Sequence, residues 1–411
     1  MSRPPKVLIV VQNLPLPGDR RVWLECQALV AAGVQVSAIT PAGPGDPAYQ
    51  LLEGVHLYKY PPPSASSGAL SFVREFAYCW LQTLRLAVRV KRERGFRVLQ
   101  ACNPPDTFWA LALLLRPLGV RFVFDQHDLC PEVYDSRFGA SGSRALRRVL
   151  LWLERRTYRT AHQVIVTNDS YREVALARGD VPEHRVTVVR TGPDGRAMRA
   201  GAPAPARRQG KAHLAAYLGV MGPQDGVDVL VRAIDHFVHV LGRKDTHFAL
   251  MGSGDAWQEV RDLVTALDLD EHVSMPGRVS DEELYETLST ADVGLSPDPP
   301  GPLNDVSTMN KTMEYMAFGL PVVCFDLKET RISAGDAGVY VAGGSVPDYA
   351  RAVADLLDDP EQRRERGAVG RRRVEDVLDW EHQSPAYVGV LQQALGDDPT
   401  GARPAVAARV A

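Results

Sequence analysis

Short apolar runs alternate with segments of helical periodicity along almost the whole chain, in two series separated by a polar stretch. The strands that this pattern predicts lie at 7–11, 34–40, 55–60, 98–101, 122–125, 164–167, 186–189, 215–220, 247–251, 273–275, 293–296 and 322–325. Parallel strands need long crossover connections, which are usually helices, so the alternation favours βαβ units. The expected fold class is therefore α/β, with two doubly wound sheets.

The polar stretch between the two series marks a domain boundary. Residues 192–210 are rich in Gly, Pro, Ala and Arg and lack apolar periodicity, which is typical of a linker. We expect an N-terminal domain over 1–191, a linker over 192–212 and a C-terminal domain over 213–378. Ligands of doubly wound sheets bind beyond the carboxyl ends of the strands, so two such domains facing each other would form a cleft. The tail 397–411 is expected to be disordered.

The composition excludes several classes of protein. The formal net charge of -3 over 411 residues argues against a dedicated nucleic-acid binder. Five scattered cysteines without a CxxC pair indicate reduced thiols in a cytosolic protein and no zinc site. The apolar run 7–11 is too short for a signal peptide or a membrane span, and no other stretch reaches about 18 apolar residues without charges. We therefore expect a cytoplasmic protein without a transmembrane helix.

The segment 307–325 combines a helix with a buried strand. Ser307 and Thr308 are residue types that cap helix N-termini, and Gly319 is a helix terminator. The run LPVVCF that follows is typical of a buried parallel strand. The free N–H groups and positive dipole of a helix N-terminus suit a phosphate, so this helix start is a candidate anion site.

Two charged side chains on that helix point to a nucleotide-sugar ligand. Lys311 would lie in the first turn and strengthen the attraction for a phosphate. Glu314, about one turn deeper, would accept hydrogen bonds from sugar hydroxyls. The alternative is an amphipathic helix with one surface Lys–Glu pair, since such pairs are common on helices.

The first loop of the chain, QNLPLPGDRR, follows the first predicted strand. Gly18 would let the backbone approach a ligand closely, and Arg20 and Arg21 would contact an anion or lie in solvent. The loop has no GxGxxG pattern, so the dinucleotide fingerprint of a dehydrogenase is absent.

Two further polar loops follow strands of the first series. His127 follows the strand 122–125, and we expect it to hold a reacting hydroxyl or a sugar hydroxyl, with Asp128 orienting its ring. The alternative is a structural His–Asp pair that caps the loop. Asn103, after the strand 98–101, would line the acceptor side or belong to a turn that starts the next helix, with Asn or Asp as the cap, and the turn is favoured.

Two loops of the second series are candidate donor contacts. Gly252 and Gly254 follow the strand 247–251, and paired glycines allow a backbone to approach a ligand, although a lone GxG is a weak signal. At Arg278 and Val279 the backbone would pair with a base edge and the guanidinium would reach a phosphate. The alternative is a turn with an exposed arginine.

Two other sequence patterns bear on metal binding and on membrane contact. Asp268 and Asp270 match an Asp-x-Asp metal pattern only formally, in a polar turn, so no metal is expected. The segment 144–159 carries six arginines interleaved with leucines. It would lie on an anionic membrane or bind an acidic acceptor, or it would be a packed helix with a solvated basic face, and the packed helix is favoured.

The segment NKTMEYMAFGLPVV resembles the nucleotide-sugar domain of the retaining glycosyltransferases of family four, as do GVMGPQDGVDVLVRAI, ALMGSGD and LNDVSTM upstream of it. The resemblance implies the GT-B fold, with two Rossmann-like domains facing across a cleft. It implies a sugar moved with retention from a nucleoside diphosphate sugar, most plausibly of UDP, to an acceptor hydroxyl. No metal or other cofactor is implied. In that family the last helix, here 379–396, returns to the N-terminal domain.

The resemblance also implies residue roles. Glu314 matches the second Glu of a motif with two glutamates, which binds ribose hydroxyls; the first Glu falls at Val306, so Asp305 is the nearest substitute. The backbone of Ser307, Thr308 and Met309 would cradle phosphate or sugar. His127 would contact the transferred sugar.

Two departures from the family's pattern concern the phosphates and the first loop. The family's Arg and Lys after the first strand of the second domain are absent from the loop that contains Gly222, so Lys311 or Arg278 would supply the charge. The family's glycine pair in the first loop is reduced to Gly18-Asp19.

Rival functions stay open on the sequence alone. An epimerase of the same fold would act without an acceptor, and a non-catalytic nucleotide-binding or partner-binding module would bind a donor without turnover. The expected partners are a nucleotide-sugar donor and an acceptor, which is a lipid-linked glycan, a polysaccharide precursor or a small natural product. Peripheral contact with the inner membrane face is compatible with the arginine-rich segment.

Overall fold

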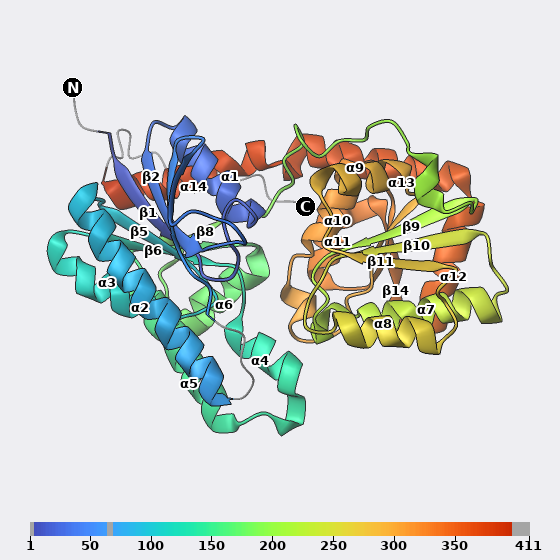
Figure 1. The fold of residues 1–411 in the computed structure, drawn as a ribbon, viewed down its shortest axis with the longest axis horizontal. Coiled ribbons are helices and arrows are strands. Elements are labelled where there is room, and N and C mark those ends of the chain that lie inside the picture. Colours follow the sequence, from blue (N-terminus) through green and yellow to red (C-terminus); the bar gives the residue numbers. More distant parts are fainter. Residues whose placement is uncertain (1–3, 64–68, 397–411) are drawn as a thin grey trace. The chain divides into compact units, whose positions relative to one another are not determined.

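The computed structural model describes residues 4–63 and 69–396, which form two α/β units (Figure 1). The first unit contains the described residues up to Arg190 and from Gln383 onward, and the second contains Thr191–His382. The fold class expected from the sequence is confirmed, because each unit is a largely parallel sheet covered by helices. The tail 397–411, expected to be disordered, lies outside the described residues.

The sheet of the first unit has eight strands in the order β3-β4-β2-β1-β5-β6-β7-β8. The strands are β1 Lys6–Val10, β2 Gln35–Pro41, β3 Tyr49–Leu52, β4 Val55–Tyr60, β5 Val98–Cys102, β6 Arg121–Gln126, β7 Gln163–Val166 and β8 Val186–Val188. All neighbours pair in parallel except β3 and β4, which form an antiparallel pair at the edge. The apolar runs predicted seven of these strands. They missed β3, which buries neither face fully.

The helices of the first unit connect these strands. They are α1 Arg20–Ala31, α2 Ala69–Glu93, α3 Trp109–Leu115, α4 Cys130–Phe138, α5 Arg144–Thr160, α6 Asp169–Gly179 and α14 Trp380–Leu395. From Gln383 onward α14 packs on the first unit, where the Tyr387 hydroxyl donates to Gln100 Oε1 over 2.7 Å. Arg121 Nη1 donates to the Ala394 carbonyl near the end of the same helix over 3.0 Å. The last helix is therefore an integral part of the first unit.

The sheet of the second unit has six parallel strands in the order β11-β10-β9-β12-β13-β14. They are β9 His213–Leu218, β10 Thr246–Met251, β11 Val273–Gly277, β12 Val293–Ser296, β13 Val322–Phe325 and β14 Gly338–Val341. Numbered by their sequence within the unit, the order is 3-2-1-4-5-6, the arrangement of dinucleotide-binding domains. The chain direction of the crossovers reverses between β9 and β12, which is where such sheets bind ligands.

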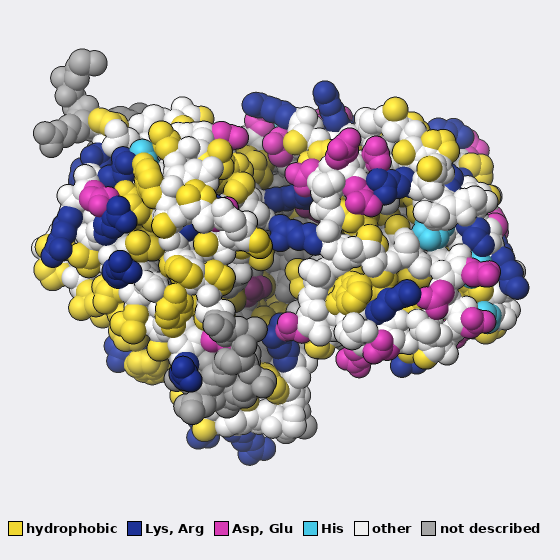
Figure 2. All heavy atoms as spheres, in the orientation of Figure 1, with side chains coloured by type: hydrophobic (Ala, Val, Ile, Leu, Met, Phe, Trp, Pro, Cys, Tyr) yellow, Lys and Arg dark blue, Asp and Glu magenta, His cyan; other side chains and the backbone are white. Residues whose placement is uncertain are grey.

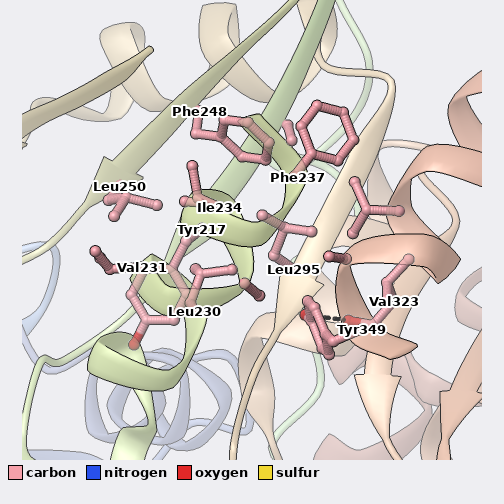
Figure 3. Packing of buried hydrophobic residues seen from close by; sticks show 14 of the residues in the cluster. Tyr217, Leu230, Val231, Ile234, Phe237, Phe248, Leu250, Leu295, Val323 and Tyr349 are labelled. Atoms are coloured by element: carbon pink, nitrogen blue, oxygen red, sulfur yellow. Dashed lines mark hydrogen bonds between the residues drawn. The ribbon is translucent and has the colours of Figure 1, made fainter. Parts of the chain in front are cut away.

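Helices cover both faces of the second sheet (Figure 1). They are α7 Val227–Asp235, α8 Trp257–Ala266, α9 Asp281–Thr290, α10 Asn310–Ala317, α11 Lys328–Ala334, α12 Val346–Asp358 and α13 Pro360–Arg373. One core layer joins the sheet to α7, α8 and α12, and Figure 3 shows Phe237, Phe248 and Tyr349 within it. The Tyr349 hydroxyl satisfies its hydrogen bond inside this core by donating to the Val323 carbonyl over 2.8 Å. A second layer joins the sheet to α9 and α10.

The segment expected to be a linker is held on the second unit. Met198 is buried in the core layer beside α9 and α10. Arg207 Nη1 lies 2.8 Å from Glu283 Oε1, and Arg208 Nη1 lies 2.6 Å from Asp292 Oδ2. The composition suggested a free spacer because the anchoring partners belong to α9 and the residues after it, about 80 residues further along the chain.

None of the helices within 4–63 and 69–396 is both long and apolar enough to cross a membrane.

Candidate functional site

The loops after β9 and β12 meet at the switch point of the second sheet. A Cβ placed on Gly226, after β9, would lie 2.3 Å from the Pro297 carbonyl oxygen, after β12, so the two loops pack without space for a side chain. Asn304 strengthens the junction, since its Nδ2 donates to the Gln224 and Pro299 carbonyls, each over 2.9 Å. Both loops are therefore fixed in place at the edge where a doubly wound sheet binds its ligand.

Helix α10 starts later than the sequence indicated. Its N-cap is Met309, which makes no side-chain capping hydrogen bond, so the expectation that Ser307 or Thr308 caps the helix is wrong. Residues 304–306 form a 3₁₀ turn, and Ser307 Oγ donates to the Leu303 carbonyl over 2.7 Å. The Ser307 hydroxyl therefore closes the preceding turn, and the start of α10 presents backbone N–H groups.

Lys311 lies in the first turn of α10, as expected, and is almost fully buried. Its Nζ lies 2.5 Å from Asp298 Oδ1 and 5.4 Å from the ring centroid of Tyr217. Asp298 is buried in turn and accepts a 2.6 Å hydrogen bond from Ser296 Oγ. Burial lowers the pKa of Lys311, but Asp298 and Asp225 together raise it by more, so the net pKa is above its ordinary value. The ammonium group keeps its charge and shares it with a buried carboxylate.

The loop after β9 runs directly past this lysine. A Cβ on Gly219 would lie 3.1 Å from Lys311 Cε, so the lysine crosses the bare side of that glycine. Further along the loop, the Gly222 N–H donates to Asp225 Oδ2 over 2.8 Å. Residues 219–226 contain no basic side chain. Lys311 therefore brings a positive charge to a loop that has none of its own.

Gly252 and Gly254 allow the loop after β10 to pack closely against the loop after β9. A Cβ on Gly252 would lie 1.8 Å from the Gly219 carbonyl oxygen, and one on Gly254 would lie 2.6 Å from that of Met221. The Met221 N–H donates to the Ser253 carbonyl over 3.1 Å. The sequence indicated close approach to a ligand, whereas the structure shows close approach of the loop after β10 to the loop after β9.

The remaining donor candidates lie around the same sheet edge. Glu314 is half-buried, one turn after Lys311 on α10. Asp305 is exposed, and its Oδ1 accepts a 2.9 Å hydrogen bond from the Lys328 N–H at the start of α11. The substitute for the family's first glutamate therefore also caps a neighbouring helix.

The strand before Arg278 is longer than expected. β11 continues through Pro276 to Gly277, with a register shift against β10, and does not stop at Met275. Arg278 is exposed just beyond the strand end, whereas Val279 packs on the core layer of α9 and α10. The shifted register lets a proline lie inside a strand that the apolar pattern truncated.

In the first unit, the ring of His127 contacts Asp125, not Asp128. His127 Nε2 lies 2.9 Å from Asp125 Oδ2 and 3.2 Å from Arg21 Nε. The expectation that Asp128 orients the ring is corrected by strand geometry, because residues two apart along a strand direction point to the same face. That spacing was visible in the sequence and was the signal that could have found Asp125.

The carboxylate of Asp125 lies within a buried charged cluster. Arg21 Nη2 is 3.2 Å from Asp125 Oδ1, Arg21 Nε is 3.1 Å from Glu25 Oε1, and Gln100 Nε2 donates to both carboxylates. Burial alone would raise the pKa of Asp125, but His127 and Arg21 lower it below its ordinary value. Burial and then Asp125 raise the pKa of Glu25 well above its ordinary value. The negative charge is therefore favoured on Asp125, and the protonated form is favoured for Glu25.

Asn103 fixes the backbone that carries His127. Its Oδ1 accepts from the N–H groups of His127 and Asp128, over 2.7 and 3.2 Å, and its Nδ2 donates to the Asp128 carbonyl over 2.8 Å. A turn does precede α3, as expected, but the expected cap is wrong, because α3 has Phe108 as its N-cap and no side-chain cap. Asn103 Nδ2 also donates to Asp106 Oδ1 over 2.9 Å within the local turn, but the partners that hold His127 follow the neighbouring strand, which local sequence cannot reveal.

The first loop contributes structure at the same edge. Asp19 caps α1 by accepting a 3.2 Å hydrogen bond from the Val22 N–H. Gly18 is half-buried before it, and Arg20 is the exposed first residue of the helix. Because Asp19 fixes the start of α1, Arg21, the second residue of the helix, is directed into the buried cluster.

One group of side chains in the described ranges has the spacing of metal ligands. Ligand atoms of Cys102, Asp125 and His127 all lie within 4.8 Å of one another. Arg21 contacts both Asp125 and His127 at 3.2 Å, and burial raises the pKa of the Cys102 thiol well above its ordinary value. A cation would have to displace a guanidinium already paired there and meet a protonated thiol, so the group does not fit a metal.

Two family models match the two units. Residues 18–192 match the glycosyl transferase 4-like domain, and residues 212–359 match the glycosyl transferases group 1 model. Two Rossmann-like units with a ligand edge of this kind define the GT-B class of transferases. The chain belongs to the glycosyltransferases of family four.

Curated relatives are similar over parts of the chain. A Corynebacterium glutamicum GDP-mannose-dependent monoacylated α-(1-6)-phosphatidylinositol monomannoside mannosyltransferase is 30% identical over 41% of this chain and 44% of its own length. The α-D-kanosaminyltransferase of Streptomyces kanamyceticus is 27% identical over 74% of this chain and 79% of its own length. The match therefore spans less than half of the first relative.

Solved structures share the fold over nearly the whole chain. Sucrose-phosphate synthase from Thermosynechococcus elongatus superposes with a TM-score of 0.74 at 18% identity, over 96% of this chain and all of that one. Anabaena HepE, in complex with UDP and glucose, gives 0.68 at 16% identity, over 95% of this chain and 98% of that one. At these identities the likeness shows the fold alone.

Proposed function

We propose that the chain is a retaining, metal-independent glycosyltransferase that moves a sugar from a nucleoside diphosphate sugar to an acceptor hydroxyl. The observation that carries the proposal is the convergence at the switch point of the second sheet. There the start of α10, Lys311 and the loop after β9 meet beside Glu314, within a segment that matches a glycosyl transferase model. These groups suit a diphosphate followed by a ribose.

In this proposal the leaving diphosphate is neutralised without a metal ion. The N–H groups at the start of α10, the backbone of the loop after β9 and the Lys311 ammonium would share its charge. Lys311 takes the place of the Arg and Lys that the family carries in that loop. Glu314 would accept hydrogen bonds from the ribose hydroxyls, while Asp305 and Arg278 would contact the sugar and phosphate from the adjacent loops.

The first unit would supply His127 to the reaction. Its ring is held by Asp125 and its backbone by Asn103, so the imidazole is pre-positioned as a hydrogen-bond partner of a sugar hydroxyl. Catalysis would then come from positioning and charge stabilisation, with no covalent intermediate required.

The donor nucleotide is proposed to be UDP, with GDP as the second candidate. The curated relatives whose names state a donor use GDP-mannose, so GDP is tested beside UDP. The acceptor is proposed to be a hydroxyl on a glycan, a glycolipid or a small natural product. The relatives' names include a phosphatidylinositol mannoside and a kanosaminyl transfer, so a lipid-linked acceptor is one arm of the screen.

The test is turnover of UDP-glucose and GDP-mannose with an acceptor panel in the presence of EDTA. Product anomers are assigned by NMR. Release of the nucleoside diphosphate with retained anomeric configuration supports the proposal. An inverted product would overturn the retaining mechanism, and turnover that EDTA abolishes would overturn metal independence. Isomerisation of the donor without an acceptor would show an epimerase instead of a transferase.

A further inference from the structure

Helix α5 exposes only arginines and apolar residues. Its exposed side chains are five arginines, together with Ala145, Leu146, Val149 and Trp152. Its one acidic residue, Glu154, is fully buried and pairs with Arg178 over 2.6 Å. A solvated helix face ordinarily mixes both signs of charge and exposes large apolar residues singly, so this face is unusual.

The two residue types form adjacent stripes along the helix. Arg144, Arg148, Arg155 and Arg159 are spaced by four, seven and four residues, which places them on one side of an α-helix. Leu146, Val149 and Trp152 follow one another at three-residue steps on the neighbouring side, and they are 46%, 49% and 47% exposed. The basic stripe spans about 22 Å at 1.5 Å per residue.

The apolar stripe is held in place by aromatic contacts. The rings of Trp152 and Trp109 meet edge to face with centroids 5.7 Å apart, and the Arg156 guanidinium lies 5.4 Å from the Trp152 ring. Trp109 opens α3, which packs on α5 and itself exposes Leu113 and Leu114. Hydrophobic side chains, with Lys and Arg among them, are spread over the visible face of the first unit in Figure 2.

We propose that this face of α5 docks on an anionic lipid bilayer. A bilayer accepts both stripes at once, since arginines pair with anionic headgroups while leucine, valine and tryptophan enter the interface. A nucleic acid or an acidic protein would pair with the arginines but would leave the apolar stripe in water, and the net charge of -3 does not favour a polyanion partner. The inference deepens the proposed function, because it would bring the enzyme to a lipid-linked acceptor.

The test is co-sedimentation of the full-length protein with vesicles of phosphatidylcholine alone and of phosphatidylcholine with phosphatidylglycerol. We expect binding to the anionic vesicles, little to the neutral ones, and release by high salt. Arg148→Gln with Arg155→Gln should weaken binding roughly 30-fold, and Leu146→Gln with Val149→Gln should also weaken it. The matched control is Arg364→Gln with Arg372→Gln, two exposed arginines of α13 in the other unit, which should bind as the wild type does.

Several outcomes would overturn the inference. One is absence of sedimentation with anionic vesicles, and another is equal weakening by the α13 control. Binding that resists the leucine and valine changes but is competed by a soluble polyanion would show simple electrostatic adhesion instead. Nucleotide binding in solution is measured alongside, so failure of vesicle binding is distinguishable from failure of the proposed function.

Discussion

Asp125 Oδ2 lies 2.9 Å from His127 Nε2, and the two side chains share one face at the carboxyl end of β6. The carboxylate is fully buried, and Arg21 contacts its other oxygen at 3.2 Å. A carboxylate held against one ring nitrogen fixes the tautomer and the orientation of an imidazole. In the proposed reaction, Nδ1 would then be the nitrogen left to meet a substrate, and Asp125 would act as a positioning residue for His127.

Replacing Asp125 with Asn should lower kcat by about 10- to 100-fold with little change in the donor KM. The ring would lose the acceptor that sets its tautomer, whereas the proposed donor site belongs to the other unit. Steady-state kinetics with a fixed acceptor measures both parameters. Asp128→Asn is the comparison, and a larger loss of kcat there than in Asp125→Asn would show that Asp128 orients the ring.

Removal of the Asn103 side chain should reduce stability and activity together. Asn103→Ala leaves the N–H groups of His127 and Asp128 without their acceptor, which should cost about 1–3 kcal/mol in unfolding free energy. Asn168→Ala is the matched control, because its Oδ1 caps α6 in the same unit over 2.7 Å. Both variants should show lower denaturant midpoints, and only Asn103→Ala should lose kcat. Equal kinetics in the two variants would contradict the positioning role.

The stability of the first unit should fall as pH rises from about 4 to 7. Burial raises the pKa of Glu154 to about 7, so its neutral form is favoured in the folded protein. A carboxyl group whose pKa is higher in the folded than in the unfolded state stabilises the folded protein at pH values below the unfolded pKa. This contribution is lost as the pH rises from the unfolded pKa to the folded pKa. The loss should be about 3 kcal/mol, measured by urea unfolding across this range.

Glu154→Gln should reduce that pH dependence, while Glu25 and Asp106, whose pKa values burial also raises, keep the remainder. The exposed Glu93, whose Oε1 accepts from Arg89, is the control site, and Glu93→Gln should leave the dependence unchanged. A wild-type profile that is flat, or one unaffected by Glu154→Gln, would show that Arg178 keeps Glu154 ionised throughout.

Gly252→Ala should disrupt the donor site through the backbone. The added Cβ would meet the Gly219 carbonyl oxygen at 1.8 Å, so the loop after β9 must move. Gly242→Ala is matched for positive φ, but its Cβ meets nothing within 4 Å, so it should cost only about 1 kcal/mol. Nucleotide affinity and the unfolding midpoint should both fall in Gly252→Ala. Normal affinity there would mean that the loop after β9 does not take part in donor binding.

The apolar pattern of the sequence predicted the strands whose side chains are buried on both faces of the sheet. Strands such as β9 and β13 appear as apolar runs because both faces of a parallel sheet are covered. The edge strand β3 has an alternating, partly exposed pattern, and β14 begins with Gly338 and is only partly buried, so neither gave a continuous run. The apolar pattern therefore missed these two edge strands, whereas the edge strands β8 and β11 did appear as apolar runs.

The residues of the candidate donor site were predictable only where they lie close together in the sequence. Lys311 and Glu314 were found because their spacing is local to one helix. The sequence did not predict two further members of these clusters. Asp298 pairs with Lys311, and Gln100 hydrogen-bonds Asp125, but in each pair the two residues belong to different strands, helices or loops. Tertiary partners of a charged group are set by packing, and a single sequence carries no signal for them.

The most direct test of the donor site is calorimetric titration with UDP and GDP in EDTA. Lys311→Met combined with Asp298→Asn removes the buried pair without leaving one charge uncompensated, and Glu314→Gln removes the ribose acceptor. Lys244→Met, an exposed lysine of the same unit, is the control. We predict that the wild type binds one of the two nucleotides and that both site variants bind it roughly 10- to 100-fold more weakly, with the control unchanged. Binding that survives both site changes, or no binding to either nucleotide, would contradict the placement of the donor at α10.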